Sequence, residues 1–482
     1  MRVVALLLAL LATTTASAAK LVPDLSDAGS LPTVTLPVGL VQKGLAAAAQ
    51  HKGLPLQFAV QVPMNLGLAN GTWDPVSGES ARWRLKLFSA GAVSLQVQFS
   101  RLRMPAGAAL WFYDSQGKLV QGPYTHASEN PDGQLATAVV LGDTALLELQ
   151  VPAALRNQAE LSVSDVFHGY RDISKAGGFG SAGACERDVV CPEGNNWSNE
   201  IRAAGLLTIS GTLCSGTLVN NSRQDDTAFF LTANHCGLNS GNASNVTVYW
   251  NFKEPSCGSN AAGDLSQNTS GATFLTSQGG SGADFALIRL NSSPASFGVY
   301  FAGWDVSGNP VTAGAGIHHP QGDTKKISIV SSADKVNNAC AADNGTTCTL
   351  AVDGWVTAWS SGVTEQGSSG SGLWDQNHHV VGTLSGGASN CNGSSSNGQP
   401  DVYARLDAAW NSGVPTLKSQ LDPSGSGVTA LNGRCPAGTG CGAAPATDTA
   451  NHFGGGMTEL TLSILGLFAA LARITARRRA SA

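Results

Sequence analysis

The sequence predicts an all-β protein, and its 482 residues are enough for more than one folded region. Two observations predict this class. The chain contains 58 Gly and only 13% charged residues, and Ser, Thr, Asn and Val are abundant, which is typical of short strands joined by many turns. Short runs in which apolar and polar residues alternate, bounded by Gly and Pro, recur along the chain, as expected for strands with one buried face.

The first residues predict a secretory signal peptide at residues 1–18. Met1 and Arg2 precede an apolar run over residues 3–12, and Ala16-Ser17-Ala18 follows as a small-residue cleavage site. This order of charged, apolar and small residues defines a signal peptide. A buried N-terminal helix is the alternative, but the run has no polar face. We therefore expect a secreted protein.

Residues 19–175 predict a β-sandwich with no cysteine and no evident catalytic cluster. Strands are expected at residues 83–88, 93–99, 109–113 and 145–151, where the alternation is clearest. The residues able to perform chemistry gather in a second strand-rich region, residues 176–433. A linker rich in Gly, Ala, Pro and Thr follows at residues 434–453.

Residues 454–482 predict a C-terminal sorting or membrane tail. Three glycines at 454–456 precede an apolar segment at 460–472, and four arginines follow it. The segment is short for a transmembrane helix, although Arg473 could snorkel within a longer one. The order resembles the Gly-Gly signals that bacterial rhomboid-type sortases process, so we expect such a sortase as a partner and transient retention in the membrane or at the cell surface. A weakly amphipathic helix is the alternative.

Charge and motif content exclude several function classes. The net charge is −5 and basic residues cluster only at the extreme C-terminus, so nucleic acid is not an expected partner. The chain has no Cys-x-x-Cys or His-Glu-x-x-His motif, and no nucleotide, flavin or haem motif. We therefore expect no metal and no cofactor. Ten cysteines follow residue 184, and in an exported protein they predict disulfides.

A tight Gly/Ser turn at residues 367–372 supplies a candidate nucleophile, Ser369. A serine hydroxyl needs a base within hydrogen-bond reach. It also needs donors for the oxyanion, and the N–H groups of Gly367 and Ser369 are the expected donors. The Gly-x-Ser-x-Gly pattern of α/β-hydrolases is not met, because position 371 is Ser. Gly/Ser turns are common in this chain, so the turn alone is weak support.

Two further segments supply a base and a carboxylate. His235 follows the apolar residues 229–231 and stands next to Cys236, which a disulfide could fix in place. Asp284 opens another apolar strand, where a buried carboxylate could hold a histidine tautomer. Either residue alone reads as an ordinary strand-end residue. Their order along the chain, histidine, aspartate and then serine, predicts a catalytic triad.

With these three segments in place, residues 183–433 resemble the bacterial lysyl endopeptidases, a branch of the chymotrypsin-fold serine peptidases. The resemblance extends to Cys-Pro-Glu-Gly at 191–194, Gly-Trp-Asp at 303–305, Ile-His-His-Pro at 317–320, Gly-Val-Thr-Glu at 362–365 and Asp-Val-Tyr-Ala-Arg at 401–405. It implies a chymotrypsin-like double β-barrel behind a β-sandwich pro-region. It also implies that His235 is the base, Asp284 the orienting carboxylate and Ser369 the nucleophile of an acyl-enzyme mechanism.

The resemblance also implies part of the disulfide framework, which cysteine counting leaves open. The pairs that it implies are Cys185–Cys391, Cys191–Cys257 and Cys214–Cys236. Proximity in the sequence then suggests Cys340–Cys348 and Cys435–Cys441.

Asp401 corresponds to the aspartate at the base of the family's primary specificity pocket. A carboxylate there would pair with a Lys or Arg side chain before the scissile bond, although context alone suggests a surface aspartate. Gly386 and Gly387 match the family's substrate-backbone edge. Ser385 stands where the family has a histidine that restricts cleavage to lysine, so the sequence leaves open whether cleavage also occurs after arginine.

The first region resembles the pro-regions of related bacterial proteases, notably at residues 83–85 and 168–171. Lys175 precedes a glycine-rich stretch, so a protease that cuts after lysine could release its own pro-region there. We therefore expect a self-activating precursor whose partners are its pro-region and peptides with a basic P1 residue. His318 and His319 are neighbours on an expected strand and should face opposite sides, so we interpret them as structural.

Two alternatives remain at this stage. An inactive protease homologue could serve as a surface binding module, although a complete triad would then be unexpected. A serine esterase is the other alternative, and Asp401 argues against it because an ester substrate rarely needs a cationic pocket.

Overall fold

The computed structural model describes residues 23–50, 55–77, 79–172, 182–280, 282–343, 345–412 and 415–439. The expected signal peptide, Lys175, Cys441 and the C-terminal tail lie outside these residues. Within the described ranges, no helix is long and apolar enough to cross a membrane.

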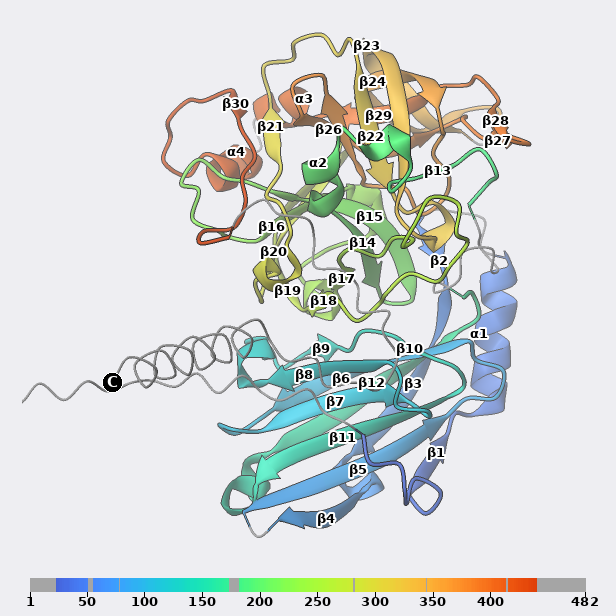
Figure 1. Cartoon of the computed structure of the whole chain (residues 1–482), viewed down its shortest axis with the longest axis vertical. Helices are drawn as coiled ribbons and strands as arrows, with labels where there is room; N and C mark the ends of the chain where they lie inside the picture. Colours follow the sequence, from blue (N-terminus) through green and yellow to red (C-terminus); the bar gives the residue numbers. More distant parts are fainter. Residues whose placement is uncertain are drawn as a thin grey trace, which may run out of the picture. The chain divides into compact units, whose positions relative to one another are not determined.

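Residues 33–169 form a β-sandwich, drawn blue to green in Figure 1. The apolar faces of the two sheets enclose a core that includes Trp83, Val97, Phe99 and Leu147, each fully buried. One sheet has the order β1-β5-β11-β7-β8 with β4 beside β5, and the other has β10-β6-β12-β3 with β9 beside β6. The strands are β1 (Thr33–Thr35), β3 (Ala59–Gly67), β4 (Thr72–Ser77), β5 (Ser80–Phe88), β6 (Ser94–Arg103), β7 (Ala109–Asp114), β8 (Val120–Thr125), β9 (Leu135–Ala136), β10 (Val140–Leu141), β11 (Thr144–Pro152) and β12 (Glu160–Gly169), and helix α1 is Val38–Gln50.

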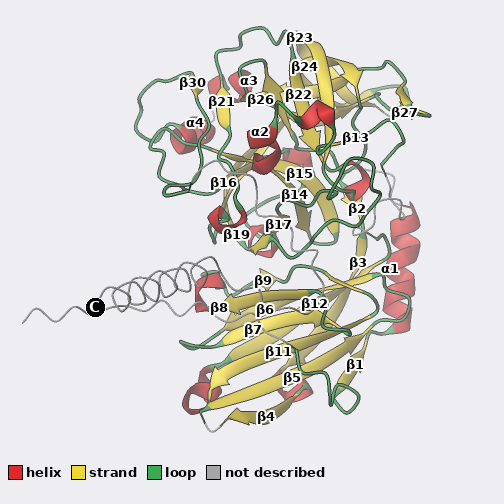
Figure 2. Cartoon of the chain, in the orientation of Figure 1, coloured by secondary structure: helices red, strands yellow, loops and turns green. Residues whose placement is uncertain are grey.

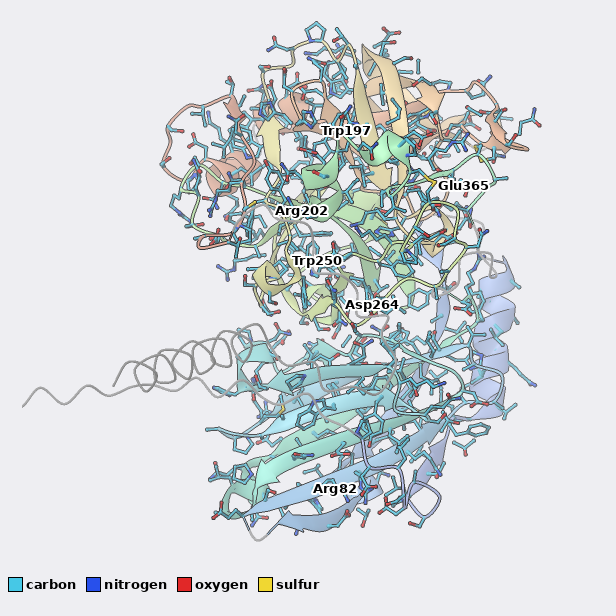
Figure 3. All side chains as sticks on the ribbon, in the orientation of Figure 1. Arg82, Trp197, Arg202, Trp250, Asp264 and Glu365 are labelled. Atoms are coloured by element: carbon cyan, nitrogen blue, oxygen red, sulfur yellow. A yellow bond between two sulfur atoms is a disulfide. The ribbon has the colours of Figure 1, made fainter. Side chains whose placement is uncertain are left out.

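The second region begins with a sheet ordered β18-β17-β14-β15-β16-β20-β19. Its end strands, β18 and β19, follow each other in the chain through Gly271, so the sheet returns on itself, and we refer to it as the first barrel. Trp250, labelled in Figure 3, is buried in its core edge-on to Phe230. The strands are β14 (Ala204–Ile209), β15 (Thr212–Val219), β16 (Phe229–Thr232), β17 (Thr247–Tyr249), β18 (Asn268–Ser270), β19 (Ala272–Gly280) and β20 (Ala283–Leu290). The short strand β2 (Leu56–Gln57), which precedes the sandwich strand β3, pairs with β15.

The following strands close into a six-stranded barrel. Its order is β25-β22-β23-β24-β29-β26, and β26 pairs back with β25. The barrel strands are β22 (Gly314–His318), β23 (Lys326–Asp343), β24 (Cys348–Ser361), β25 (Gly372–Asp375), β26 (His379–Gly387) and β29 (Asp401–Arg405), with β13 (Arg187–Asp188), β21 (Gly303–Asp305) and β30 (Ala430–Leu431) at its margins and the pair β27 (Cys391–Asn392) and β28 (Ser395–Ser396) outside it.

Helices play a minor part, as Figure 2 shows by the few red segments among yellow strands. In the second region they are α2 (Ser198–Ala203), α3 (Leu406–Asn411) and α4 (Pro415–Leu421). The predicted all-β class, with a β-sandwich ahead of a chymotrypsin-like double barrel, is confirmed.

Between residues that the structure describes, four disulfides are formed, namely Cys185–Cys391, Cys191–Cys257, Cys214–Cys236 and Cys340–Cys348. They are the pairs that the resemblance and sequence proximity suggested. The fifth expected pair includes Cys441 and lies outside the described residues. Cys185–Cys391 closes a separation of 206 residues, whereas Cys340–Cys348 closes one of 8 residues at the end of the β23–β24 hairpin.

These two bridges should differ in their effect on stability. In the chain-entropy model a bridge destabilises the unfolded chain more when its loop is longer, by about 5 kcal/mol for Cys185–Cys391 and about 2.5 kcal/mol for Cys340–Cys348. Replacing both cysteines of each bridge by Ala and measuring urea unfolding should reveal this difference in the free energy of unfolding. Equal losses for the two double variants would contradict the prediction.

Candidate active site

His235 and Asp284 meet between two strands of the first barrel. His235 follows β16 in a short 3₁₀ turn, Asn234–Cys236, and Asp284 lies at the start of the neighbouring strand β20. The Nδ1 atom of His235 lies 2.7 Å from Oδ2 of Asp284, and the backbone N–H of His235 donates to Oδ1 at 3.0 Å. Two hydrogen bonds therefore fix both the position and the orientation of the ring.

The charges around Asp284 favour its ionised form. The side chain is almost fully buried, and burial alone would raise its pKa, but the hydrogen bonds and charge of His235, together with the hydroxyl of Ser385, outweigh burial, and the pKa lies below its usual value. An ionised carboxylate accepts a hydrogen bond from Nδ1–H, which leaves Nε2 of His235 as the free basic atom. Within the described residues, Nε2 is buried and has no hydrogen-bond partner.

The turn that carries Ser369 is seated against the end of the first barrel, close to His235. The N–H of Ser215 on β15 donates to the carbonyl of Ser369 at 2.8 Å. Gly370 approaches the first barrel so closely that a Cβ there would clash with Thr232 and lie 2.7 Å from the backbone nitrogen of Ala233. Since His235 is two residues beyond Ala233, this contact brings Ser369 and His235 to one site.

The two expected oxyanion donors are free for a ligand. Among the described residues, the N–H groups of Gly367 and Ser369 donate to no protein acceptor. The carbonyl of Gln366 accepts from the N–H of Gln321 at 2.5 Å. Because a trans peptide is planar, the N–H of Gly367 points away from that carbonyl. Amides left open in a tight turn can stabilise a developing oxyanion.

Asp401 lies at the wall of a cavity that also reaches Ser369. The cavity has a volume of about 820 Å³ and is lined by both residues, together with Thr364, Ser389 and Gly386. Asp401 is only 1% exposed. Burial raises its pKa above the usual value, although several hydrogen bonds oppose this. A carboxylate in such a cavity favours a cationic partner, because the ion pair would relieve the cost of burying a charge.

Three side chains hold the carboxylate of Asp401, and the sequence prediction missed their roles. The indole of Trp359 and the hydroxyl of Thr364 each donate to Oδ2 at 2.8 Å. The hydroxyl of Ser389 also donates to Oδ2, and its N–H donates to Oδ1 at 3.2 Å. Thr364 belongs to the Gly-Val-Thr-Glu motif, which could have indicated it. Trp359 and Ser389 carried no such signal.

The glycine pair on β26 lines the cavity, as expected of a substrate edge. Gly387 has a φ of +156°, and a Cβ there would clash with the carboxylate of Asp401 and lie 2.5 Å from its Cα. At Gly386, a Cβ would lie 2.5 Å from the carbonyl oxygen of Ala341, on the hairpin that carries the Cys340–Cys348 bridge. Both positions require glycine.

Ser385 does not line this cavity. Side chains alternate along a strand, and its fully buried hydroxyl lies on the side of Asp284, where it helps to lower the pKa of that carboxylate. Its Oγ has no partner with full hydrogen-bond geometry among the described residues. Ser385 therefore bears on the histidine–aspartate pair rather than on the pocket wall.

A separate group of possible metal ligands lies at the ends of strands of the second barrel. Donor atoms of Asp305, Asp375 and His379 lie within 4.8 Å of one another. The two carboxylates already accept backbone N–H bonds, from Ser307 to Asp305 and from His379 to Asp375. We assign no metal to this group.

The class of this protein, a serine endopeptidase, follows from its similarity to known proteins. The family model of the lysyl endopeptidase C-terminal domain matches residues 179–404, and that of the lysyl endopeptidase N-terminal domain matches residues 38–170. A lysyl endopeptidase of Pseudomonas aeruginosa (strain PAO1) is 30% identical over 410 residues, which cover 76% of this chain and 82% of that protein. The chain belongs to the lysyl endopeptidase family.

Two solved structures show a more distant likeness. A Glu endopeptidase in complex with MPD is 19% identical and covers 47% of this chain and 93% of its own, with a TM-score of 0.29. An inactive mutant form of Rv3671c from M. tuberculosis H37Rv is 15% identical and covers 48% of this chain and 90% of its own, with a TM-score of 0.30. Family membership rests on the sequence matches and not on these likenesses.

The close approach of Gly387 to Asp401 gives a direct test of the cavity. Gly387→Ala should displace the carboxylate and weaken binding of n-butylamine, a cation that resembles a lysine side chain, by about 100-fold. Gly398→Ala is the matched control, because Gly398 also has a positive φ, +74°, but a Cβ there meets nothing within 4 Å. Isothermal titration calorimetry on both variants measures the effect, and equal affinities would contradict it.

Proposed function

We propose that this protein is a secreted endopeptidase that cuts after lysine, with arginine as a second P1 residue, through an acyl-enzyme on Ser369. One observation carries the proposal. A single cavity of about 820 Å³ is lined both by Ser369 and by the buried carboxylate of Asp401. A side chain that reaches Asp401 as a cation would place the adjoining peptide bond next to the serine. Membership of the lysyl endopeptidase family supports the same assignment.

The proposed mechanism uses each group for one task. Nε2 of His235 takes the proton of Ser369 as Oγ attacks the scissile carbonyl, and Asp284 stabilises the resulting imidazolium. The N–H groups of Gly367 and Ser369 bind the oxyanion. His235 then protonates the leaving amine, the C–N bond breaks, and an acyl-enzyme remains. Water, activated by the same histidine, hydrolyses that ester and restores Ser369.

Specificity follows from Asp401 and its neighbours. Oδ2 accepts three hydrogen bonds and is fully used, whereas Oδ1 accepts only one, so Oδ1 has a lone-pair position left for a cationic substrate group. An ammonium, as a compact point charge, needs only one such position, and a guanidinium can also donate a single N–H to it. We therefore propose that lysine and arginine are both accepted. The histidine that restricts cleavage to lysine in the family is absent, because position 385 is Ser in this chain. The hydroxyl of Ser385 lies on the side of Asp284 and not in the cavity.

A cleavage-site profile tests the proposed activity. Denatured proteins digested with the matured enzyme should be cut after Lys, and to a smaller extent after Arg, as read by mass spectrometry. Ser369→Ala, matured in trans, should lose activity by about 10⁴-fold or more, and Asp401→Asn should lose cleavage after basic residues. Cuts after other residues would contradict the role of Asp401. A folded, matured protein that makes no cuts would favour the inactive-homologue reading.

The contact between the pro-region and the first barrel supports synthesis as a latent precursor. Leu56 and Gln57 of β2 pair antiparallel with Leu213 and Thr212 of β15. Leu213 directly precedes Cys214, and a Cβ at Gly367 would lie 2.9 Å from its Cδ1. The pro-region thus occupies a strand edge beside the oxyanion turn, where a substrate chain could otherwise add. We propose that cleavage at Lys175 by the enzyme itself ends this restraint.

The pairing of β2 with β15, which is proposed to keep the precursor inactive, can be weakened without removing the pro-region. In a precursor that carries Lys175→Ala, we expect negligible activity on a lysine anilide. Adding Leu56→Asp places a charge in the buried cluster around β2 and should loosen the pairing of β2 with β15. The activity of the precursor on the lysine anilide should then rise about 10-fold, which corresponds to a loss of roughly 1.4 kcal/mol in the stability of that contact. Val38→Asp, at a position that is 58% exposed on α1, serves as the control. Equal activity of the Leu56 and Val38 variants would contradict the proposed restraint.

A further inference from the structure

The paired histidines at 318 and 319 have separate surroundings. Both side chains are fully buried. The ring of His319 stacks on Phe252, and its Nδ1 lies 3.0 Å from the carbonyl of Asp323. The ring of His318 faces the other way, and its Nδ1 lies 2.8 Å from Oγ of Ser368, the residue immediately before the nucleophile. Of the two imidazole rings, that of His318 thus contacts the turn that carries Ser369, whereas His319 approaches the turn with its backbone carbonyl, 2.9 Å from a Cβ placed at Gly367.

The hydrogen bonds around His318 define one tautomer. The hydroxyl of Ser328 donates to the carbonyl of Val363 at 2.5 Å, so its Oγ must accept from Nε2–H of His318, 3.1 Å away. Nε2 also lies 3.9 Å from the carboxyl group of Glu186. Burial, aided by the charge of Lys326, lowers the pKa of His318 to about 3, and the ring is neutral. Nδ1 is therefore the acceptor for the hydroxyl of Ser368.

Ser368 is held from two sides in this way. Its hydroxyl donates to His318, and its Oγ accepts the N–H of Glu365 at 3.2 Å. Gly367 and Ser368 lie between the two peptide groups whose N–H atoms are left open, those of Gly367 and Ser369. Glu365, which lies two residues before the turn, is labelled in Figure 3. Fixing the side chain of Ser368 restricts the dihedral angles between these amides.

The segment that begins with His318 and ends with Gln321 contacts the turn at a second point. Gln321, three residues beyond His318, donates its N–H to the carbonyl of Gln366 at 2.5 Å and has a left-handed φ of +55°. This bond sets the direction of the Gly367 amide, as argued above. The segment from His318 to Gln321 thus contacts the peptide group that carries the N–H of Gly367 and the side chain of Ser368, whose carbonyl belongs to the peptide group that carries the N–H of Ser369.

We propose that His318 is a positioning residue for the oxyanion turn, which it holds through the hydroxyl of Ser368 so that both open amides converge on one oxygen. This inference rests on the proposed peptidase function. It gives the Ile-His-His-Pro segment a role in catalysis without contact with the substrate. Loss of a whole oxyanion donor costs about 10²–10³ in kcat, and misdirected donors should cost about 10- to 100-fold.

The test compares transition-state binding with ground-state binding. Wild type, His318→Ala, His318→Asn and Ser368→Ala precursors are matured by tagged wild-type enzyme, which is then removed. For each protein, kcat and KM are measured on a lysine anilide. Inhibition constants are measured for a lysine aldehyde, which forms a tetrahedral adduct with the serine, and for n-butylamine, which binds only in the cavity of Asp401.

His318→Ala should lower kcat by about 10- to 100-fold with little change in KM, and should weaken binding of the lysine aldehyde by a similar factor. Binding of n-butylamine should stay unchanged. Asn at 318 can offer Oδ1 to the hydroxyl of Ser368, and His318→Asn should restore most of kcat. Ser368→Ala, which removes only one hydroxyl, should show the same changes in kcat and in aldehyde binding as His318→Ala. It provides the same test if His318→Ala fails to fold.

The control is Leu417→Ala, which opens a cavity at a fully buried position on α4. It should lower Tm without changing the ratio of the two inhibition constants. If His318→Ala and Ser368→Ala both keep the wild-type ratio of the inhibition constants for the lysine aldehyde and n-butylamine, the inference is overturned while the proposed function stays intact. Equal losses in His318→Asn and His318→Ala would also overturn it. A wild-type protein that neither cuts the anilide nor binds the aldehyde would overturn both.

Discussion

The proposed catalytic arrangement depends on the close approach of the turn at residues 367–370 to Ser215 on β15 and to the end of β16. The approach is possible because position 370 is glycine, with a φ of +80° and no room for a Cβ. Ser215 then binds the carbonyls of Ser369 and Gly367 through its N–H and its hydroxyl. The turn thereby comes to rest beside the strand that leads to His235, so one packing contact sets the geometry of nucleophile and base together.

A disulfide reinforces this contact. Cys214 directly precedes Ser215, and Cys236 directly follows His235, and the two are bridged. The strand that supports the turn and the segment that carries the imidazole therefore cannot separate. The carboxylate of Asp284 completes the arrangement from β20 with two hydrogen bonds to His235. Side chains with little freedom need little reorganisation during reaction, which is the physical basis of preorganised catalysis.

The pocket depends on a different constraint, the burial of Asp401. Its strand, β29, pairs with β24 and β26, so the carboxylate occupies a fixed sheet position rather than a loop. Hydrogen bonds from Trp359, Thr364 and Ser389 offset part of the desolvation cost, yet the pKa of Asp401 stays raised because burial outweighs them. In the proposed function, the remaining cost is relieved when a cationic side chain enters, which would favour basic residues over neutral ones of similar size.

Sequence reasoning could find the sandwich strands and the order of His235, Asp284 and Ser369, because periodicity and local motifs are properties of contiguous residues. It could not find the donors to Asp401 at Trp359 and Ser389, which come from segments that meet only in the folded sheet. The pairing of β2 with β15 was equally hidden, since two residues carry no periodicity. Adjacent histidines on a strand face opposite sides, which supports only a structural interpretation of His318, and its contact with Ser368 could not be found because 50 residues separate the two in the sequence.

The central claim is that Ser369 and Asp401 belong to one site. Labelling of the matured protein with a lysine-derived diphenyl phosphonate, and with its norleucine counterpart of nearly the same size but without charge, tests it directly by peptide mapping. We predict a phosphonylated Ser369, formed much faster with the lysine reagent, and loss of that preference in Asp401→Asn. Labelling at another residue, or equal rates for the two reagents, would contradict it.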